Sequence, residues 1–306
     1  MSASPIAVSE QPPAPRRLRI GIAIATVGRP AIVAKTIRLL SAQSRPPDAV
    51  LVCSPSGTDV EGVPQADPGI VCLIGPHGLP HQRNCLLQAA GDLDLLLFLD
   101  DDFVLRHNYI EEMEAIFLEN PTVVMTTGRV LADGIKGPGL TFEFAQRKLS
   151  YVAEKAPDRL TDVYSGYGCN MAVRLETVRR NGLAFDEALP LYAWLEDVDF
   201  SRSLSPFGRI VRAERALGVH LGVKTGRQRG ERLGYSQIAN PCYLISKGTC
   251  SWKKGLFHIS RNIAANLYGT MRGERAVDRP ARLYGNLRGI ADLMTQRLAP
   301  SRALEL

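Results

Sequence analysis

The sequence has 306 residues and 45% hydrophobic content, and 37 Lys and Arg against 31 Asp and Glu give a formal net charge of +6. This length suits one large folded domain with an appendage, and no apolar run approaches the roughly 18 residues of a membrane-spanning helix. Residues 1–17 are rich in proline, serine and alanine without an apolar core, so we expect a disordered lead and not a signal peptide. Six cysteines without a CxxC pair predict reduced, buried thiols in a cytoplasmic protein.

Short apolar runs alternate with helical patterns from residue 18 onward. We expect strands over 18–26, 49–53, 70–74, 93–99 and 122–130, and helices over 30–43, 81–90 and 109–118. The pattern is less regular over 131–162. A strand-like segment with glycines follows over 162–173, and a helix starting near Asp197 and a strand over 210–220 complete the predicted core. Repeated strand-loop-helix units predict an α/β fold with three layers around a parallel sheet, over residues 18–223.

Three consecutive aspartates, Asp100, Asp101 and Asp102, follow the buried run that ends at Leu99. In open α/β sheets, ligands bind beyond the carboxyl ends of such strands. Crowded carboxylates repel one another unless a cation is present, and hard oxygen ligands suit Mg²⁺ or Mn²⁺. One aspartate would satisfy a helix cap, so the triplet predicts a metal or nucleotide site. Asp100 and Asp102, as alternate residues of an extended segment, should point the same way.

A second acidic cluster, Glu196, Asp197 and Asp199, follows Trp194 at the predicted start of a helix. The helix dipole favours acids in a first turn, and one carboxylate there can also act as a general base toward an acceptor hydroxyl. The two interpretations are compatible, because the start of a helix can present an acid into a cleft. Trp194 would either pack in the core or stack on an acceptor sugar.

Four segments, taken in order, resemble family 2 glycosyltransferases. They are the turn after the first strand (residues 25–29, ATVGR), residues 78–84 (GLPHQRN), the aspartate triplet, and residues 194–199 (WLEDVD). Each segment alone is weak, but their joint order and spacing over residues 18–221 make the chain similar to this family of inverting enzymes. The resemblance implies a GT-A fold, a nucleoside-diphosphate sugar donor and a divalent cation, Mn²⁺ or Mg²⁺. It also implies a glycan or lipid-linked glycan acceptor in bacterial surface or exopolysaccharide assembly.

The resemblance further implies roles for single residues. Asp197 would be the general base, with Glu196 as the second candidate. Asp102 would hold the metal, and His220 would be either a further ligand or a structural histidine. The residues implied for binding the nucleotide-sugar are Thr26, Arg29, Ser54, Arg83, Asp100, Asp101, Asn170, Trp194, Arg227 and Arg229.

Three of these binding assignments leave alternatives open. Arg83, on the helix predicted over 81–90, would either approach the nucleotide or the aspartate triplet, or be an exposed helical side chain. The family usually places an acidic residue after the second strand to read the base, whereas this chain has Ser54 in that run, so the identity of the nucleotide is left open. Arg227 and Arg229 stand in a glycine-containing loop, where they would close over the diphosphate or simply form a surface loop.

Residues 224–306 form a predicted basic, helical extension with fifteen Lys and Arg against five Asp and Glu, or about +10, which leaves about −4 for the remainder. Apolar residues stand between its arginines: Leu283, Leu287, Ile290, Leu293, Met294 and Leu298. This pattern suits attachment at an anionic membrane surface, which would make the protein peripheral at the inner face of the plasma membrane. It equally suits packing onto the catalytic domain or a second subunit. Few aromatics are interleaved with the charges, so we expect no nucleic-acid partner.

Two other functions stay open at this point. A nucleotidyltransferase that makes NDP-sugars would carry a glycine-rich, basic loop after the first strand, whereas residues 25–30 are short and poor in glycine. A non-catalytic glycan- or nucleotide-binding module would lack the base or the metal carboxylates, and both acidic clusters are intact.

Overall fold

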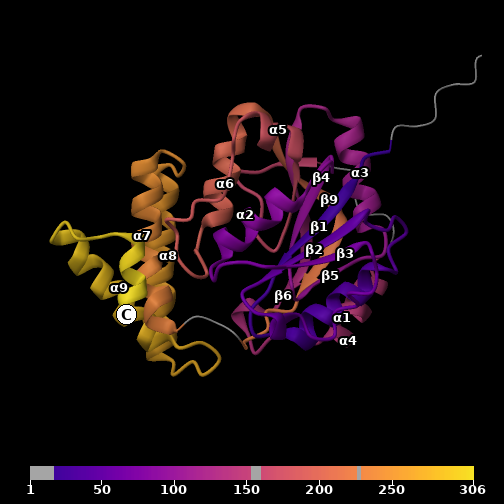
Figure 1. Ribbon diagram of the computed structural model, residues 1–306. Helices are drawn as coiled ribbons and strands as arrows, with labels where there is room; N and C mark the ends of the chain where they lie inside the picture. Colours follow the sequence, from indigo (N-terminus) through magenta and orange to yellow (C-terminus); the bar gives the residue numbers. More distant parts are fainter. Residues whose placement is uncertain (1–16, 153–159, 226–228) are drawn as a thin grey trace, which may run out of the picture.

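A computed structural model describes residues 17–152, 160–225 and 229–306 of the chain (Figure 1). The predicted disordered lead, apart from Arg17, lies outside these residues. Within the described ranges, no helix is both long enough and apolar enough to cross a bilayer. All six cysteines are free thiols, and three of them are buried.

The described strands form one mixed sheet with the order β3-β2-β1-β4-β8-β6-β9-β5, and β7 also pairs with β9. The strands are β1 (Ile20–Ala25), β2 (Ala49–Ser54), β3 (Ile70–Ile74), β4 (Leu95–Asp100), β5 (Phe103–Leu105), β6 (Val123–Asp133), β7 (Leu160–Asp162), β8 (Asn170–Arg174) and β9 (Arg209–His220). Strands β1 to β4 pair in parallel, as expected. Strand β8 runs antiparallel to both β4 and β6, and β5 and β7 run antiparallel to β9.

The prediction of a parallel sheet is therefore wrong for β5, β7 and β8. The segment predicted as one strand over 162–173 is divided into the end of β7, a glycine-containing turn and β8. These two strands are not neighbours, because β7 pairs with β9 whereas β8 lies between β4 and β6. An apolar run in the middle of a sheet looks the same in either direction, because both of its faces are buried.

Helices cover both faces of the sheet, which confirms the three-layer α/β/α arrangement. The helices are α1 (Pro30–Leu40), α2 (Leu79–Ala89), α3 (Tyr109–Glu119), α4 (Phe142–Ser150), α5 (Leu175–Arg180) and α6 (Glu196–Leu204). Helices α1 and α3 pack on one face with Leu95, Leu97 and Leu99 of β4. Helices α2, α5 and α6 pack on the other face with Leu96 and Phe98. The alternating side chains of β4 are buried on both sides, which explains its continuous apolar sequence.

Three further helices, α7 (Gly230–Lys247), α8 (Trp252–Met271) and α9 (Arg279–Met294), follow the sheet. Figure 1 shows them grouped beside α2 and α6. Leu244 of α7 packs with Leu195 and Val198 at the start of α6. The prediction of a helical extension is confirmed, and Pro241 lies inside α7. The division into a catalytic domain over 18–223 and an extension over 224–306 stays a prediction.

Candidate active site

The aspartate triplet stands at the carboxyl end of β4 and points in two directions. Asp101 turns inward, where its carboxylate accepts a hydrogen bond from Thr26 Oγ1 at 2.6 Å. Asp100 and Asp102 turn the other way, and their oxygens lie 3.5 Å and 3.3 Å from His220 Nε2. Only Asp100 belongs to the strand, whereas Asp101 and Asp102 form the turn between β4 and β5. This turn, and not the alternation of an extended segment, brings Asp100 and Asp102 to His220.

Asp100, Asp102 and His220 could together hold a metal ion, because their ligand atoms all lie within 4.8 Å of one another. Asp102 Oδ2 accepts a hydrogen bond from Val223 N at 2.7 Å, whereas Oδ1 is buried and has no hydrogen-bond partner among the described residues. This oxygen faces His220 Nε2 at 3.3 Å without a well-formed hydrogen bond, and a cation would satisfy the buried oxygen and the imidazole together. Two carboxylates and an imidazole suit a divalent ion such as Mn²⁺. The residues present therefore fit the cation that the sequence predicted.

Asp133, at the end of β6, sets the orientation of His220. Its Oδ1 lies 3.0 Å from His220 Nδ1, and its Oδ2 accepts the hydroxyl of Tyr167 at 2.8 Å. Nε2 is thereby left facing the aspartates, as in metal-binding histidines whose second ring nitrogen donates to a carboxylate. Burial opposes the charged imidazole, but Asp102 and Asp133 raise the pKa of His220 to about 10. A cation bound at Nε2 would take the place of the proton there.

Thr26 and Arg29 lie on the turn after β1 and both contact the triplet. Arg29 Nη1 is 3.2 Å from Asp101 Oδ1 and 3.7 Å from Asp102 Oδ2. Burial raises the pKa of Asp101 to about 7, although Arg29 opposes the shift. Burial also acts on Asp102, but the neighbouring His220 and Arg29 outweigh it and lower the pKa of that carboxyl. The turn therefore supplies positive charge to the triplet.

Arg83 on α2 connects the triplet to the second acidic cluster. Its guanidinium is buried, and Nη1 donates to Glu196 Oε1 at 2.6 Å. Nη2 donates to Gly168 O at 2.8 Å and lies 3.6 Å from Asp100 Oδ1. Burial works against the charge of Arg83, but Glu196 and Asp100 outweigh it and raise its pKa. The sequence-predicted residues Arg83, Asp100 and Glu196 are thus brought into one network.

Asp197 is the most accessible carboxylate of the second acidic cluster. Glu196 and Asp199 are buried, whereas Asp197 is only partly so. Its Oδ2 accepts a hydrogen bond from Gly168 N at 3.0 Å, and its Oδ1 accepts one from Val198 N at 2.8 Å. Burial raises the pKa of Asp197 in spite of these bonds. A held carboxylate with a raised pKa that keeps some access to solvent suits a general base.

The turn that leads into α6 is held by the C-terminal helices. Three of its non-glycine residues have positive φ angles of 59°, 48° and 73°: Leu191, Ala193 and Leu195. Such conformations are strained and persist only where the surroundings enforce them. Asn240 of α7 donates to Trp194 O at 2.8 Å, and the Trp194 ring meets His258 of α8 edge-on at 5.7 Å. Trp194 therefore packs against the extension, and its stacking on a sugar stays a prediction.

A partly exposed ion pair also joins the extension to α6. Lys247 Nζ, at the end of α7, lies 2.7 Å from Asp199 Oδ2 and 2.5 Å from Asp186 Oδ2. Thr249 Oγ1 donates to Asp199 Oδ1 at 2.5 Å. With both of its oxygens occupied, Asp199 links the extension to the helix that carries Asp197.

The sequence also predicts nucleotide-sugar binding by Ser54, Asn170, Arg227 and Arg229. Ser54 is fully buried, and its hydroxyl donates to a carbonyl of the following loop. Asn170 is also fully buried, and its side chain bonds to β6. Arg229 is exposed just before α7, and Arg227 lies outside the described residues. Nucleotide-sugar binding by these four residues stays a prediction.

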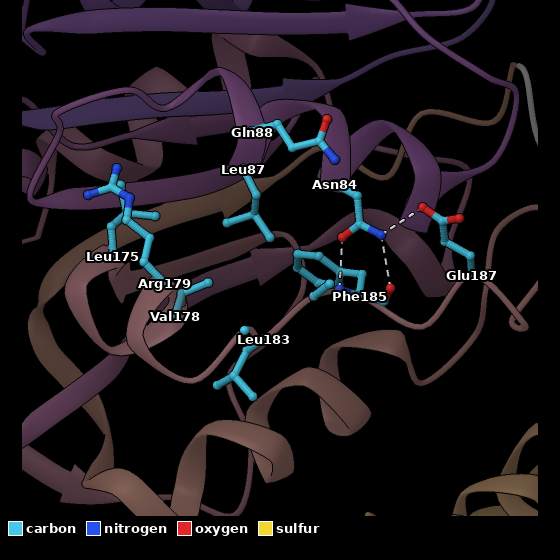
Figure 2. A pocket seen from close by; sticks show the side chains of 11 residues that line it. Asn84, Leu87, Gln88, Leu175, Val178, Arg179, Leu183, Phe185 and Glu187 are labelled. Atoms are coloured by element: carbon cyan, nitrogen blue, oxygen red, sulfur yellow. Dashed lines mark hydrogen bonds between the residues drawn. The ribbon is translucent and has the colours of Figure 1, made fainter.

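A surface pocket of about 620 Å³ lies between α2 and α5. Figure 2 shows Asn84 at its edge, pointing toward Phe185 and Glu187. The Asn84 amide donates to Phe185 O at 3.0 Å and to Glu187 Oε1 at 2.8 Å, and it accepts from Phe185 N at 2.8 Å. No residue of either acidic cluster lines this pocket. Asn84 therefore holds the loop after α5 against α2, while its neighbour Arg83 contacts both acidic clusters.

Sequence reasoning missed Asp133, Asn240 and Lys247. An acid at the end of a long strand was the only local signal for Asp133. The register of β6 and β9, which pairs Asp133 with His220, is a long-range property. Nothing in the local sequence of Asn240 or Lys247 points to the turn before α6.

No protein-family model matches this chain, and no curated protein matches it. Solved structures do match. S. aureus TarS 1–349 gives a TM-score of 0.57 at 13% identity, covering 92% of this chain and 90% of that chain. The mannosyltransferase PcManGT from Pyrobaculum calidifontis, in complex with GDP-Man and Mn²⁺, gives 0.53 at 14% identity, covering 91% and 88%. GalNAc-T7 with UDP, GalNAc and Mn²⁺ gives 0.54 at 14% identity and covers 82% of this chain, which spans 58% of the GalNAc-T7 chain. At these identities the likeness shows the fold alone, which is the GT-A fold of glycosyltransferases.

Proposed function

We propose that this chain is a metal-dependent, inverting glycosyltransferase of the family 2 type. It would move a sugar from a nucleoside diphosphate to a hydroxyl of a glycan or lipid-linked glycan in surface or exopolysaccharide assembly. One observation carries the proposal: a candidate metal cluster (Asp100, Asp102, His220) and a held carboxylate, Asp197, belong to one network. Arg83 contacts Asp100 directly and reaches Asp197 through Gly168, whose carbonyl accepts from Arg83 and whose amide donates to Asp197. Two structures with the same fold are described with Mn²⁺ and a nucleotide or nucleotide-sugar, which supports this class of donor and cofactor.

Each part of the network has a task in such a transfer. A cation held by Asp102, His220 and Asp100 would neutralise the negative charge that develops on the departing diphosphate. Asp197 takes the proton from the acceptor hydroxyl as that oxygen attacks the anomeric carbon. Glu196 is buried against Arg83, and burial raises its pKa to about 8 although Arg83 opposes the shift. The base is therefore Asp197, the more accessible of the two carboxylates. Attack on the face opposite the leaving group inverts the anomeric configuration.

The two alternatives receive less support. The turn between β1 and α1 places Thr26 and Arg29 against the triplet, but it is too short and too poor in glycine for the loop of a nucleotidyltransferase. A non-catalytic binding module needs no general base, whereas this chain holds the partly accessible carboxylate of Asp197 in place by a backbone hydrogen bond.

The test is a screen of NDP-sugars with Mn²⁺, followed by Asp197→Asn on the donor and acceptor that it identifies. Loss of a general base typically lowers kcat by about 10² to 10⁴, while donor affinity should change little. Asp92→Asn, at an exposed ion pair, is the matched control and should be normal. NMR of the product should show an inverted anomeric configuration. Near-normal turnover in Asp197→Asn would place the base elsewhere, with Glu196 next, and a retained configuration would rule out the inverting mechanism.

A further inference from the structure

Helices α8 and α9 reverse the usual burial of a helical bundle. The buried residues of α8 are Gly255, Asn266 and Gly269, and those of α9 are Gly285, Asn286 and Gly289. Large apolar side chains of the same helices have 49 to 81% of their surface exposed: Leu256, Phe257, Leu267, Tyr268, Met271, Tyr284, Leu287 and Met294. In water the hydrophobic effect favours the opposite arrangement. The outward side chains therefore indicate a surface that meets something apolar.

The inward faces pack through small residues and buried amides. A Cβ atom added at Gly285 would lie 2.1 Å from Glu231 O, so the backbones of α9 and α7 are in close contact. Asn266 of α8 donates to Gln237 Oε1 at 2.9 Å and to Asn286 Oδ1 at 2.8 Å. Close contact at glycines and amide hydrogen bonds are how helices associate in apolar surroundings. The bundle thus holds together while its large apolar side chains remain available outside.

The outward residues of α8 form a stripe with a basic flank. Phe257, Tyr268 and Met271 are separated by 11 and 3 residues, close to whole turns of an α-helix, so they share one side. The guanidinium of Arg261 lies 5.7 Å from the centre of the Phe257 ring, and that of Arg272 lies 5.1 Å from the Tyr268 ring. An apolar stripe bordered by arginines is typical of helices that lie in the plane of a membrane interface.

We propose that α8 and α9 attach this protein to the surface of an anionic phospholipid bilayer. The stripe would enter the boundary between headgroups and acyl chains, and the flanking arginines would meet lipid phosphates. Charge selects this occupant, because residues 224–306 carry fifteen Lys and Arg against five Asp and Glu, and polybasic segments are attracted to anionic leaflets. A second copy of the chain would bring two basic surfaces together, which like-charge repulsion opposes. The attachment does not depend on the proposed activity.

Vesicle co-sedimentation of the full chain tests the attachment. Vesicles of phosphatidylcholine with about one third phosphatidylglycerol should bind the protein, and pure phosphatidylcholine should bind it at least tenfold more weakly. Binding should fall as salt rises from 0.15 M to 1 M, because the screening length shortens from about 8 Å to about 3 Å. Phe257→Ser with Tyr268→Ser should weaken binding about a hundredfold, roughly tenfold for each ring withdrawn from the interface.

Two further variants provide a control and measure the electrostatic contribution of the arginines to vesicle binding. Phe207 follows α6, outside the C-terminal helices, and its ring is half exposed. The Phe207→Ser variant should therefore bind vesicles as the wild type does. Arg261→Gln with Arg272→Gln should weaken binding to anionic vesicles by about 25-fold and leave the weak binding to neutral vesicles unchanged. Because the substituted side chains are exposed, each variant should melt at the wild-type temperature, which serves as the check on folding.

Some results would contradict attachment to an anionic bilayer. Absence of binding, or equal binding to neutral and anionic vesicles, would overturn the proposal. A dimer in sedimentation analysis that Phe257→Ser converts to a monomer, without vesicle binding by the wild type, would make this face an interface between copies. Vesicle binding needs neither metal nor nucleotide, so its failure is distinguishable from a failure of the proposed transferase activity.

Discussion

Replacing Lys247 by methionine should destabilise the protein and slow the proposed transfer together. The ammonium group of Lys247 is the cation beside Asp199, whose side chain is 1% exposed. Breaking a fully buried ion pair costs about 3 to 5 kcal/mol. Lys247 is 31% exposed and Thr249 still donates to Asp199, so we expect a loss of about 2 to 3 kcal/mol in the free energy of unfolding. Because Asp199 and Asp197 share the first turn of α6, kcat should also fall more than donor affinity.

Urea unfolding measures the stability change as a shift in midpoint at constant slope. The matched control is Lys35→Met, which removes a pair with Glu143 whose side chains are 45% and 69% exposed and should cost under about 1 kcal/mol. Adding Asp199→Asn to Lys247→Met removes the stranded carboxylate and should restore part of the loss. Equal losses in Lys247→Met and Lys35→Met would refute the structural role given to this pair.

Two more predictions concern the site, and a third concerns backbone packing at Gly222. Because burial raises the pKa of Asp197, that carboxyl gains its proton at a higher pH than a free aspartate, so turnover should fall with decreasing pH through a value above about 3.9. A pH-rate profile whose acid limb lies lower would contradict this. Asp133→Asn removes the carboxylate beside His220 Nδ1 and should weaken Mn²⁺ binding about 10- to 100-fold in calorimetry, and unchanged affinity would argue against His220 as a ligand. Gly222→Ala should lower the melting temperature more than Gly273→Ala. Both glycines have φ near 65°, which costs alanine about 1 to 2 kcal/mol, but only a Cβ at Gly222 meets backbone, at 2.3 Å, whereas the space around Gly273 is open. Equal shifts would show that this contact relaxes freely.

The features that sequence reasoning predicted well are local ones. The continuous apolar run of β4 follows from the geometry of a single strand, and the structure shows it. Asp100 and Asp102 do converge, but the turn after β4 brings them together and not the alternation of a strand. The start of α6 at Glu196 follows from acids in a first helical turn. Such features can be predicted without knowing which distant segments are neighbours, because consecutive residues alone show burial on two faces and the two-residue period of a strand.

The features that were missed depend on contacts between distant segments. The antiparallel direction of β8 is set by its pairing with β4 and β6, and the contact of Asp133 with His220 is set by the register of β6 on β9. The extension was predicted to be helical, but apolar periodicity alone does not tell which face is buried. Buried Asn266 and Asn286 find their partners on other helices, so the outward position of the apolar side chains became visible only in the assembled bundle.

Calorimetric titration of UDP and GDP into wild-type protein and Asp102→Asn, with and without Mn²⁺, tests the proposed metal site most directly. Asparagine keeps the shape of Asp102 but removes the charge beside His220. We predict that one of the nucleotides binds the wild type tightly only when Mn²⁺ is present. The variant should bind it weakly and to the same extent with or without the cation, while the exposed control Asp92→Asn should behave as the wild type. Undiminished, Mn²⁺-dependent binding by Asp102→Asn would contradict the assignment of the cation to the end of β4.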